Sequence, residues 1–110
     1  MSETKTNLLQ GTLDLLILKA LGPGELHGLG ISRRIEQITR GTFLVKPGSL
    51  FPALHRMEEA GWIRAEWITK DTGRRARMYE LTAAGKKQLS TEESRWQAVS
   101  SAINRVLREA

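Results

Sequence analysis

The stretch from Lys46 to Gly61, Lys-Pro-Gly-Ser-Leu-Phe-Pro-Ala-Leu-His-Arg-Met-Glu-Glu-Ala-Gly, decides the fold. Its opening suits a helix start, because proline has a helical φ already and its missing N–H costs nothing in the first turn. It closes with glycine, the residue that commonly follows a helix end. Leu50, Leu54 and Met57 recur at steps of four and three, so they share one face. The pattern predicts a helix over 47–60 with an apolar inner face.

The opposite side of this helix is small, polar and mildly basic. A rotation of 100° per residue places Ser49, Pro52, His55, Arg56 and Glu59 there. A short helix with one apolar face and one such polar face can be laid into the groove of a larger partner.

The charge of the chain indicates an anionic partner. The formal net charge is +5 over 110 residues. Residues 46–90 carry nine Lys or Arg against five Asp or Glu, so this section holds four of the five excess charges. The length fits one domain, and the 40% hydrophobic content is that of a globular protein. The lack of a signal peptide pattern and of a membrane-spanning run predicts a cytoplasmic protein.

Two further helices are predicted before this stretch. The apolar stripe over Leu8–Leu21 predicts a first helix, and its width indicates that a second subunit covers part of it. The residues from about His27 to Arg40 predict a second helix, which Gly41 ends. Two short helices with a tight connection are typical of a helix-turn-helix.

After Gly61 the period changes to that of strands. Residues 62–68 and 76–81 alternate and are rich in aromatic and β-branched types, and a basic turn lies between them. The chain therefore predicts a hairpin with a cationic tip, over 69–77, as a winged helix requires.

The last part of the chain predicts a helix from Ala83 to Glu109, which Thr82 caps. A break near Ser90 is the alternative, because a second capping pattern begins there. The apolar residues of this helix fall at coiled-coil spacing and predict a seam with a symmetry mate and with the first helix. The predicted dimer interface contains Leu9, Leu13, Leu16, Leu89, Trp96, Val99, Ile103 and Val106.

Three blocks of the sequence resemble the PadR-like transcriptional regulators. They are His27–Ile31, Pro47–Ile63 and Gly73–Gly85, and they occur in the order and at the spacing of that family. The resemblance implies an α+β fold, mainly α with a small β-hairpin: a winged helix-turn-helix DNA-binding domain over 1–82 and a C-terminal dimerisation helix over 83–110. It also implies a homodimer that represses transcription by binding an inverted repeat.

The chain departs from the family at three positions. Tyrosine is frequent in the family where this chain has Phe51, Leu29 and Met78. Phe51 cannot donate a hydrogen bond to a phosphate, so a DNA contact there has to be apolar, for example to a thymine methyl group. The other two departures are interpreted as packing changes.

On this interpretation, the exposed face of the helix reads bases and the basic residues hold phosphates. Arg to guanine is the commonest specific contact, and each neutralised phosphate releases counterions. The predicted DNA-binding residues are Lys46, Ser49, Pro52, His55, Arg56, Arg74, Arg75 and Arg77. The alternative for the three wing arginines is a solvated turn with no partner.

Trp96 has two interpretations. The favoured one is packing in the dimer interface. The other is that Trp96 lines a pocket near the dyad and stacks on a flat hydrophobic or aromatic effector, as some relatives use this region.

Other functions fit the sequence less well. An enzyme is disfavoured because there is no phosphate-binding glycine loop, nucleophile–base pair or carboxylate cluster. His27 and His55 are far apart and there is no cysteine, so neither a metal site nor a cofactor is predicted. A winged-helix adaptor for protein partners remains the alternative, although such an adaptor has no need of an arginine-rich wing.

Overall fold

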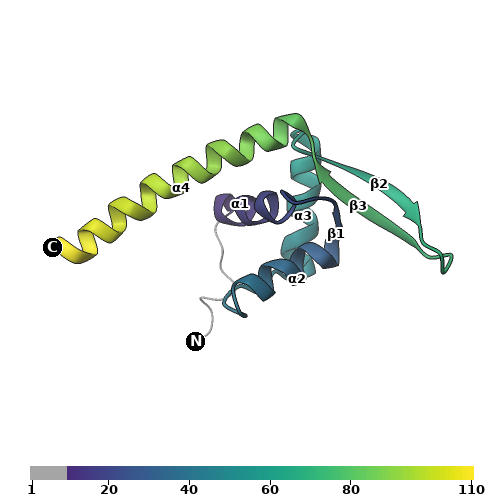
Figure 1. The fold of residues 1–110 in the computed structure, drawn as a ribbon, viewed down its shortest axis with the longest axis horizontal. Coiled ribbons are helices and arrows are strands. Elements are labelled where there is room, and N and C mark those ends of the chain that lie inside the picture. The colour runs from purple at the N-terminus through teal and green to yellow at the C-terminus, as the bar shows by residue number, and fades with distance from the viewer. Residues whose placement is uncertain (1–9) are drawn as a thin grey trace.

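The computed structural model describes residues 10–110, which form four helices and one three-stranded antiparallel sheet (Figure 1). The elements are α1 (Gln10–Ala20), β1 (Leu26–His27), α2 (Gly28–Ile38), α3 (Pro47–Glu59), β2 (Ile63–Thr69), β3 (Arg75–Leu81) and α4 (Ala83–Glu109). This order confirms the predicted fold class, a winged helix-turn-helix followed by a long C-terminal helix.

The core lies where α1, α2 and α3 meet the base of the sheet. Its most deeply buried side chains are Ile17, Leu18, Leu21, Ile31, Leu50, Leu54 and Met57. The apolar row of α3 is thus wholly inside, as its spacing predicts. Strand β2 contributes Ile63, and β3 contributes Tyr79 and Leu81, to the same cluster.

The first two helices begin and end close to the predicted positions. The part of α1 that is described starts at Gln10, so Leu8 and the predicted interface residue Leu9 lie outside the described residues. Helix α2 starts one residue later than predicted, because His27 is its N-cap and accepts a hydrogen bond from the Gly30 amide (2.8 Å).

Helix α2 also ends earlier than the prediction of Arg40. The Thr39 hydroxyl donates to the Ile35 carbonyl (2.8 Å) and accepts from the Phe43 amide (3.1 Å), which turns the chain away from the helix. Arg40 and Gly41 then have positive φ angles of 52° and 81°, a conformation that ends a helix.

The sheet contains one strand that the sequence did not predict. The strand order is β1-β3-β2, with Leu26 opposite Tyr79 and His27 opposite Met78. The long pair β2–β3 is the predicted hairpin, in which Trp67 lies opposite Arg77. Strand β1 fastens the start of α2 to the hairpin and so fixes the wing relative to the helices.

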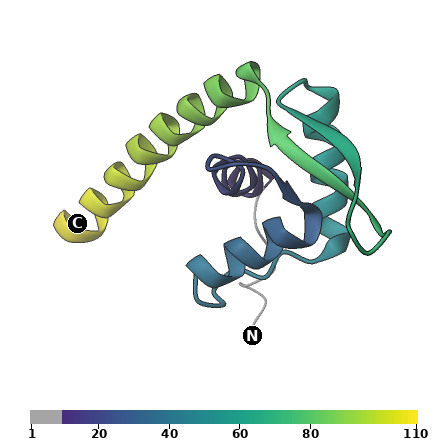
Figure 2. The same ribbon diagram turned by 45° about the vertical axis from the view of Figure 1, so that its right-hand side comes forward.

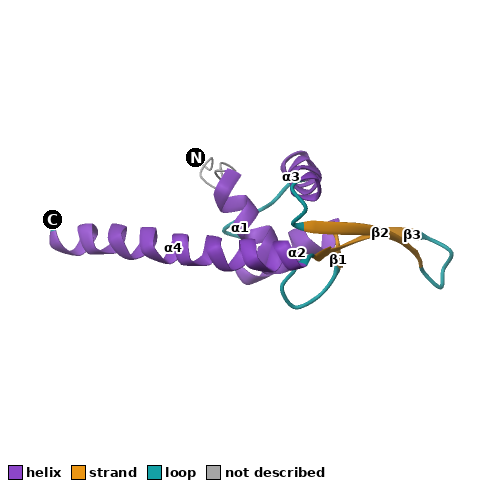
Figure 3. Ribbon diagram, turned by 90° about the horizontal axis from the view of Figure 1, so that it is seen from above, coloured by secondary structure: helices purple, strands orange, loops and turns teal. Residues whose placement is uncertain are grey.

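Helix α4 is continuous, which confirms the prediction of one helix without a break near Ser90. The Thr82 hydroxyl caps it by accepting from the Gly85 amide (3.0 Å). Its first turns pack on α1 and the base of the sheet, and its second half extends away from the other elements (Figures 2 and 3). No helix within residues 10–110 has the length and apolarity needed to cross a membrane.

Candidate nucleic-acid interface

Helix α3 presents a free surface beside its buried row. Pro47 occupies the first turn and Lys46 is an exposed N-cap whose side chain makes no capping bond. The exposed residues of the helix include Gly48, Ser49, Phe51, Pro52 and His55. The Ser49 and Leu50 amides both donate to the Lys46 carbonyl (2.9 Å each) and Pro47 has no N–H. The Lys46 side chain and the Gly48 amide therefore remain at this electropositive end, which is suited to an anion.

Two features shape the first two turns of α3. A Cβ on Gly28 would lie 2.8 Å from Phe51 Cε1, so glycine at the start of α2 lets the Phe51 ring pack close to it. Phe51 still keeps 47% of its surface exposed. Pro52 has no N–H to bond the carbonyl of Gly48, four residues before it, which leaves that carbonyl open to an outside donor.

Arg56 is placed differently from the prediction. It lies on the flank of α3 and donates to Asp14 Oδ1 on α1 (2.5 Å). The Asp14 side chain is 10% exposed and that of Arg56 is 38% exposed. The helical rotation assigned Arg56 to the free face, but a partner on α1 draws its guanidinium toward the interior.

The environment of Asp14 explains why it needs this partner. Burial raises the pKa of the Asp14 carboxyl, the charge and hydrogen bond of Arg56 lower it, and the nearby Glu92 on α4 raises it again. The pair therefore joins α1 to α3 around one buried charge, and the like charge of Glu92 on α4 opposes that charge.

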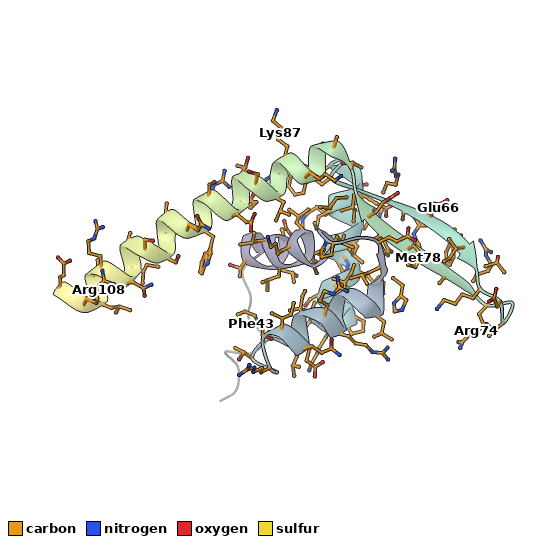
Figure 4. The ribbon with its side chains drawn as sticks, in the orientation of Figure 1. Phe43, Glu66, Arg74, Met78, Lys87 and Arg108 are labelled. Carbon is orange, nitrogen blue, oxygen red and sulfur yellow. The ribbon has the colours of Figure 1, made fainter. Side chains whose placement is uncertain are left out.

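The tip of the hairpin is a tight turn. Lys70 N donates to the Arg74 carbonyl (2.7 Å) and Gly73 N donates to the Lys70 carbonyl (2.8 Å). Gly73 has a φ of 87°, which glycine adopts without strain. Arg74 lies at this tip, at the end of the molecule away from α4 (Figure 4).

The wing arginines differ in their surroundings. Arg77 donates to Glu58 on α3 (3.1 Å), so it links the wing to that helix. The guanidinium carbon of Arg75 lies 4.7 Å from the centre of the Trp67 ring, and that of Arg77 lies 5.5 Å from it. Arg74 and Arg75 are exposed, as their predicted role requires.

A basic hollow of about 550 Å³ separates the wing from the start of α2. It is lined by His27, Leu29, Lys70, Thr72, Arg74 and Arg75. Three cationic side chains face one concave surface, and such a concentration favours a polyanion. Leu29 and Lys70 were not among the predicted DNA-binding residues, because only the fold brings the wing next to α2.

The predicted dimer residues divide into two groups. Trp96, Val99, Ile103 and Val106 form an exposed apolar row on α4, and Leu107 lies beside them. Leu13 and Leu89 instead pack inside the subunit: Leu13 is a buried core residue and Leu89 is partly buried against the core. The core of one subunit accounts for their apolar character, and their part in a dimer interface stays a prediction. Leu16 is partly buried at the edge of the same core.

Trp96 stands between two shallow hollows at the contact of α4 with α1. One, of about 250 Å³, is lined by Gly11, Thr12, Leu15, Glu92, Arg95, Trp96 and Val99. The other, of about 240 Å³, is lined by Leu15, Leu16, Lys19, Glu93, Trp96 and Gln97. An ion pair between Lys19 and Glu93 (2.8 Å) fastens the two helices beside it.

The sequence missed three residues of this site: Asp14, Glu58 and Trp67. Trp67 was not among the predicted DNA-binding residues, although 53% of its surface is exposed. If the pairing of the two strands is counted from the turn, Trp67 lies opposite Arg77. This register is a signal in the sequence for the contact of Trp67 with the wing arginines. The partners of Asp14 and Glu58 come from distant segments, so no local pattern shows them.

Comparison with known proteins finds relatives that are transcriptional regulators. The family model "Transcriptional regulator PadR-like family" matches residues 17–91. The transcriptional regulator Rv3488 of Mycobacterium tuberculosis is 37% identical over 81 residues, which are 74% of this chain and 71% of that protein.

Solved structures show the same fold. A PadR-like transcriptional regulator from Bacillus cereus superposes with a TM-score of 0.80 at 27% identity, over 93% of this chain and 97% of that one. Bacillus subtilis PadR in complex with operator DNA superposes with a TM-score of 0.65 at 28% identity, over 72% of this chain and 45% of that one.

Proposed function

Because the chain belongs to the PadR-like family of transcriptional regulators, we propose that it is a dimeric, sequence-specific repressor that binds an inverted repeat in double-stranded DNA. One observation carries the proposal: the free face of α3 lies beside an arginine-bearing wing, and the Arg77–Glu58 ion pair joins them (3.1 Å). A helix for the major groove and a cationic hairpin for the backbone are thereby held as one unit.

Base reading falls to the first two and a half turns of α3. Ser49 and His55 offer polar groups, and Pro52 and Phe51 offer apolar surface for a thymine methyl group. The pairing of Arg56 with Asp14 supports a different role for Arg56, which is to orient α3 on α1. This revises the prediction that Arg56 reads guanine.

Phosphate contacts fall to the cationic residues around this face. Lys46 and the Gly48 amide at the start of α3 hold one phosphate. Arg74 and Arg75 hold others from the wing, with Lys70 in the same hollow. Each phosphate neutralised adds to the salt dependence of binding.

Dimerisation follows from the apolar row on α4. Beyond the hollows that it shares with α1, helix α4 extends away from the other described elements, yet the exposed apolar row that starts at Trp96 continues through Val99, Ile103 and Val106 at coiled-coil spacing. A symmetry mate covers this row and sets two α3 helices about one DNA turn apart, about 34–36 Å. The domain division at residues 82 and 83 belongs to this proposal.

A small hydrophobic or aromatic effector is part of the proposal. The hollows beside Trp96 lie next to the apolar row, so a second subunit closes them into an apolar chamber. A planar ligand stacked on Trp96 there shifts α4 relative to α1 and releases the operator. Titration of the protein with planar aromatic compounds tests this, with tryptophan emission as the signal in a variant that keeps Trp96 alone. Unchanged emission with every compound contradicts the effector site.

The DNA-binding proposal is tested by fluorescence anisotropy with duplexes from the chain's own upstream region and with scrambled duplexes, at several salt concentrations. Arg74→Ala and Arg75→Ala should each weaken binding to both duplexes. Each should also reduce the steepness of the plot of log binding constant against log salt concentration by roughly 0.9, the value for one phosphate contact. Ser49→Ala and His55→Ala should reduce the preference for the upstream duplex. The adaptor alternative predicts no binding to either duplex, even in dilute buffer.

Action on DNA also agrees with the predicted cytoplasmic location.

A further inference from the structure

The wing carries a large aromatic side chain on the half of the hairpin that extends beyond the core. Trp67 lies two residues before the end of β2 and exposes 53% of its surface. Arg77, directly across the strand pair, and Arg75, which lies diagonally to it, both place their guanidinium groups over its ring (5.5 and 4.7 Å). A large apolar residue that is half exposed and contacts two cations calls for an explanation beyond packing.

The register shows which way this cluster faces. Ile63, Ala65 and Trp67 alternate along one face of β2, and Tyr79 and Arg77 continue that face on β3. Ile63 and Tyr79 belong to the buried core. Trp67 therefore projects from the core-facing side of the sheet, beyond the end of the core and on the side of α3.

The two arginines are not equivalent. Arg77 stacks on Trp67 and also pairs with Glu58 on α3, so its charge is used within the protein. Arg75 stacks on the same ring and has no ion pair among the described residues. Stacking uses only the face of a guanidinium group, so the N–H groups around the edge of Arg75 remain available to a phosphate.

We propose that Trp67 is a positioning residue for DNA binding: it holds the Arg75 guanidinium flat, with its edge free, for the sugar–phosphate backbone of a duplex. This rests on the proposed function. The arrangement lowers the conformational entropy that a long side chain loses when it binds, because the rotamer of Arg75 is already restricted. The Arg77–Glu58 pair holds Arg77 over the same ring and keeps the cluster next to α3.

The expected size of the effect is small but measurable. An exposed cation–π contact corresponds to roughly a two- to five-fold change in an equilibrium constant. We therefore expect Trp67→Leu to weaken binding to any duplex by roughly two- to five-fold. Trp67→Phe retains a ring for the guanidinium and should recover most of the affinity.

The experiment is a double-mutant cycle with Trp67→Leu and Arg75→Gln. Binding is measured by anisotropy to a labelled duplex of scrambled sequence and about 30 base pairs, roughly three helical turns. If Trp67 acts through Arg75, Trp67→Leu costs affinity in the wild-type background and costs nothing further when Arg75 is already Gln. Its salt slope stays that of the wild type, since Arg75 still neutralises its phosphate, whereas Arg75→Gln lowers the slope by roughly 0.9.

Arg64→Gln is the matched charge control. Arg64 is an exposed arginine of the same hairpin on the opposite face of the sheet, where it pairs with Glu80 (2.9 Å). It should change affinity less than Arg75→Gln does. Thermal melting of each variant shows whether the wing substitutions leave the fold intact.

The possible results separate the two proposals. If Arg75→Gln weakens binding and Trp67→Leu does not, or if Trp67→Leu costs as much in the Arg75→Gln background as in the wild type, the positioning role is wrong and the DNA-binding function stands. An equal cost in both backgrounds indicates that the indole contacts DNA itself or only stabilises the hairpin. If the wild type binds no duplex, the proposed function is wrong and the positioning role is wrong with it.

Discussion

Removal of Arg56 tests whether its ion pair with Asp14 fixes α3 on α1 and stabilises the fold. The Arg56→Met variant keeps the apolar stem of the side chain but leaves Asp14 without its cation. Loss of one partner of a buried ion pair costs about 3–5 kcal/mol. Arg56 is 38% exposed and water screens part of the pair, so we expect about 1.5–3 kcal/mol. This loss lowers the melting temperature by on the order of 10 °C.

The loss should depend on pH with a definite sign. Burial already raises the pKa of Asp14, and removal of Arg56 removes the two influences that lower it. A native carboxyl with a raised pKa opposes folding while it is ionised, and this cost disappears as the carboxyl is protonated. The stability difference between wild type and Arg56→Met is therefore largest at neutral pH and shrinks as the pH falls toward about 4, the range of an ordinary carboxyl.

The assay is urea unfolding of both proteins at several pH values, followed by circular dichroism. Arg64→Met is the control, because the exposed Arg64–Glu80 pair (side chains 65% and 37% exposed) should contribute at most about 1 kcal/mol. The double variant Asp14→Leu/Arg56→Met removes both charges and should recover most of the stability. A pH-independent deficit, or a double variant as unstable as Arg56→Met, refutes the reasoning.

The same double variant decides the role of Arg56 in DNA binding. If Arg56 only orients α3, the stable double variant should distinguish the upstream duplex from a scrambled one as well as the wild type does. If Arg56 reads a guanine, discrimination should fall by about 1–3 kcal/mol although the fold is intact. The second result restores the prediction made from the helical rotation.

Three further substitutions test other parts of the structure. Gly85→Ala places a Cβ 1.9 Å from the Trp62 carbonyl oxygen, a clash with backbone that should lower the unfolding free energy by about 2 kcal/mol or more in urea titrations. Thr82→Ala removes the α4 cap and the hydroxyl's bond to the Gly61 carbonyl (2.6 Å), and should cost about 1–2 kcal/mol in the same assay. Ile103→Glu places a charge in the exposed α4 row. Light scattering should then show a monomer at micromolar concentration, and thermal melting should show that this monomer is still folded. A dimer of unchanged mass contradicts the proposed interface.

Local patterns were sufficient for most of the secondary structure. The apolar spacing of α3 and the alternation of the hairpin are short-range signals, and both were confirmed with boundaries within a residue or two. Strand β1 has only two residues and no period of its own. It exists because Leu26 and His27 meet Tyr79 and Met78, which is a consequence of tertiary structure.

The side-chain predictions were less complete for a related reason. Rotation about a helix places Arg56 well away from the buried row, but it does not distinguish a free flank from one that faces a partner on α1. Asp14 lies 42 residues earlier in the chain. The apolar residues Leu13 and Leu89 posed the same difficulty, because an apolar side chain is compatible with the core of one subunit and with an interface between two.

The positions of the polar anchors on α3 explain how recognition and stability are divided along one helix. Arg56 fastens α3 to α1 and Glu58 fastens it to the wing, and both lie in its last turns. The first turns, with Ser49 and Pro52, have no such partner among the described residues. Substitutions there should alter DNA binding with little effect on folding, whereas substitutions in the last turns should alter folding first and DNA binding through it. Arg56 and Glu58 thus set the orientation of the free face of α3 from the opposite end of the helix.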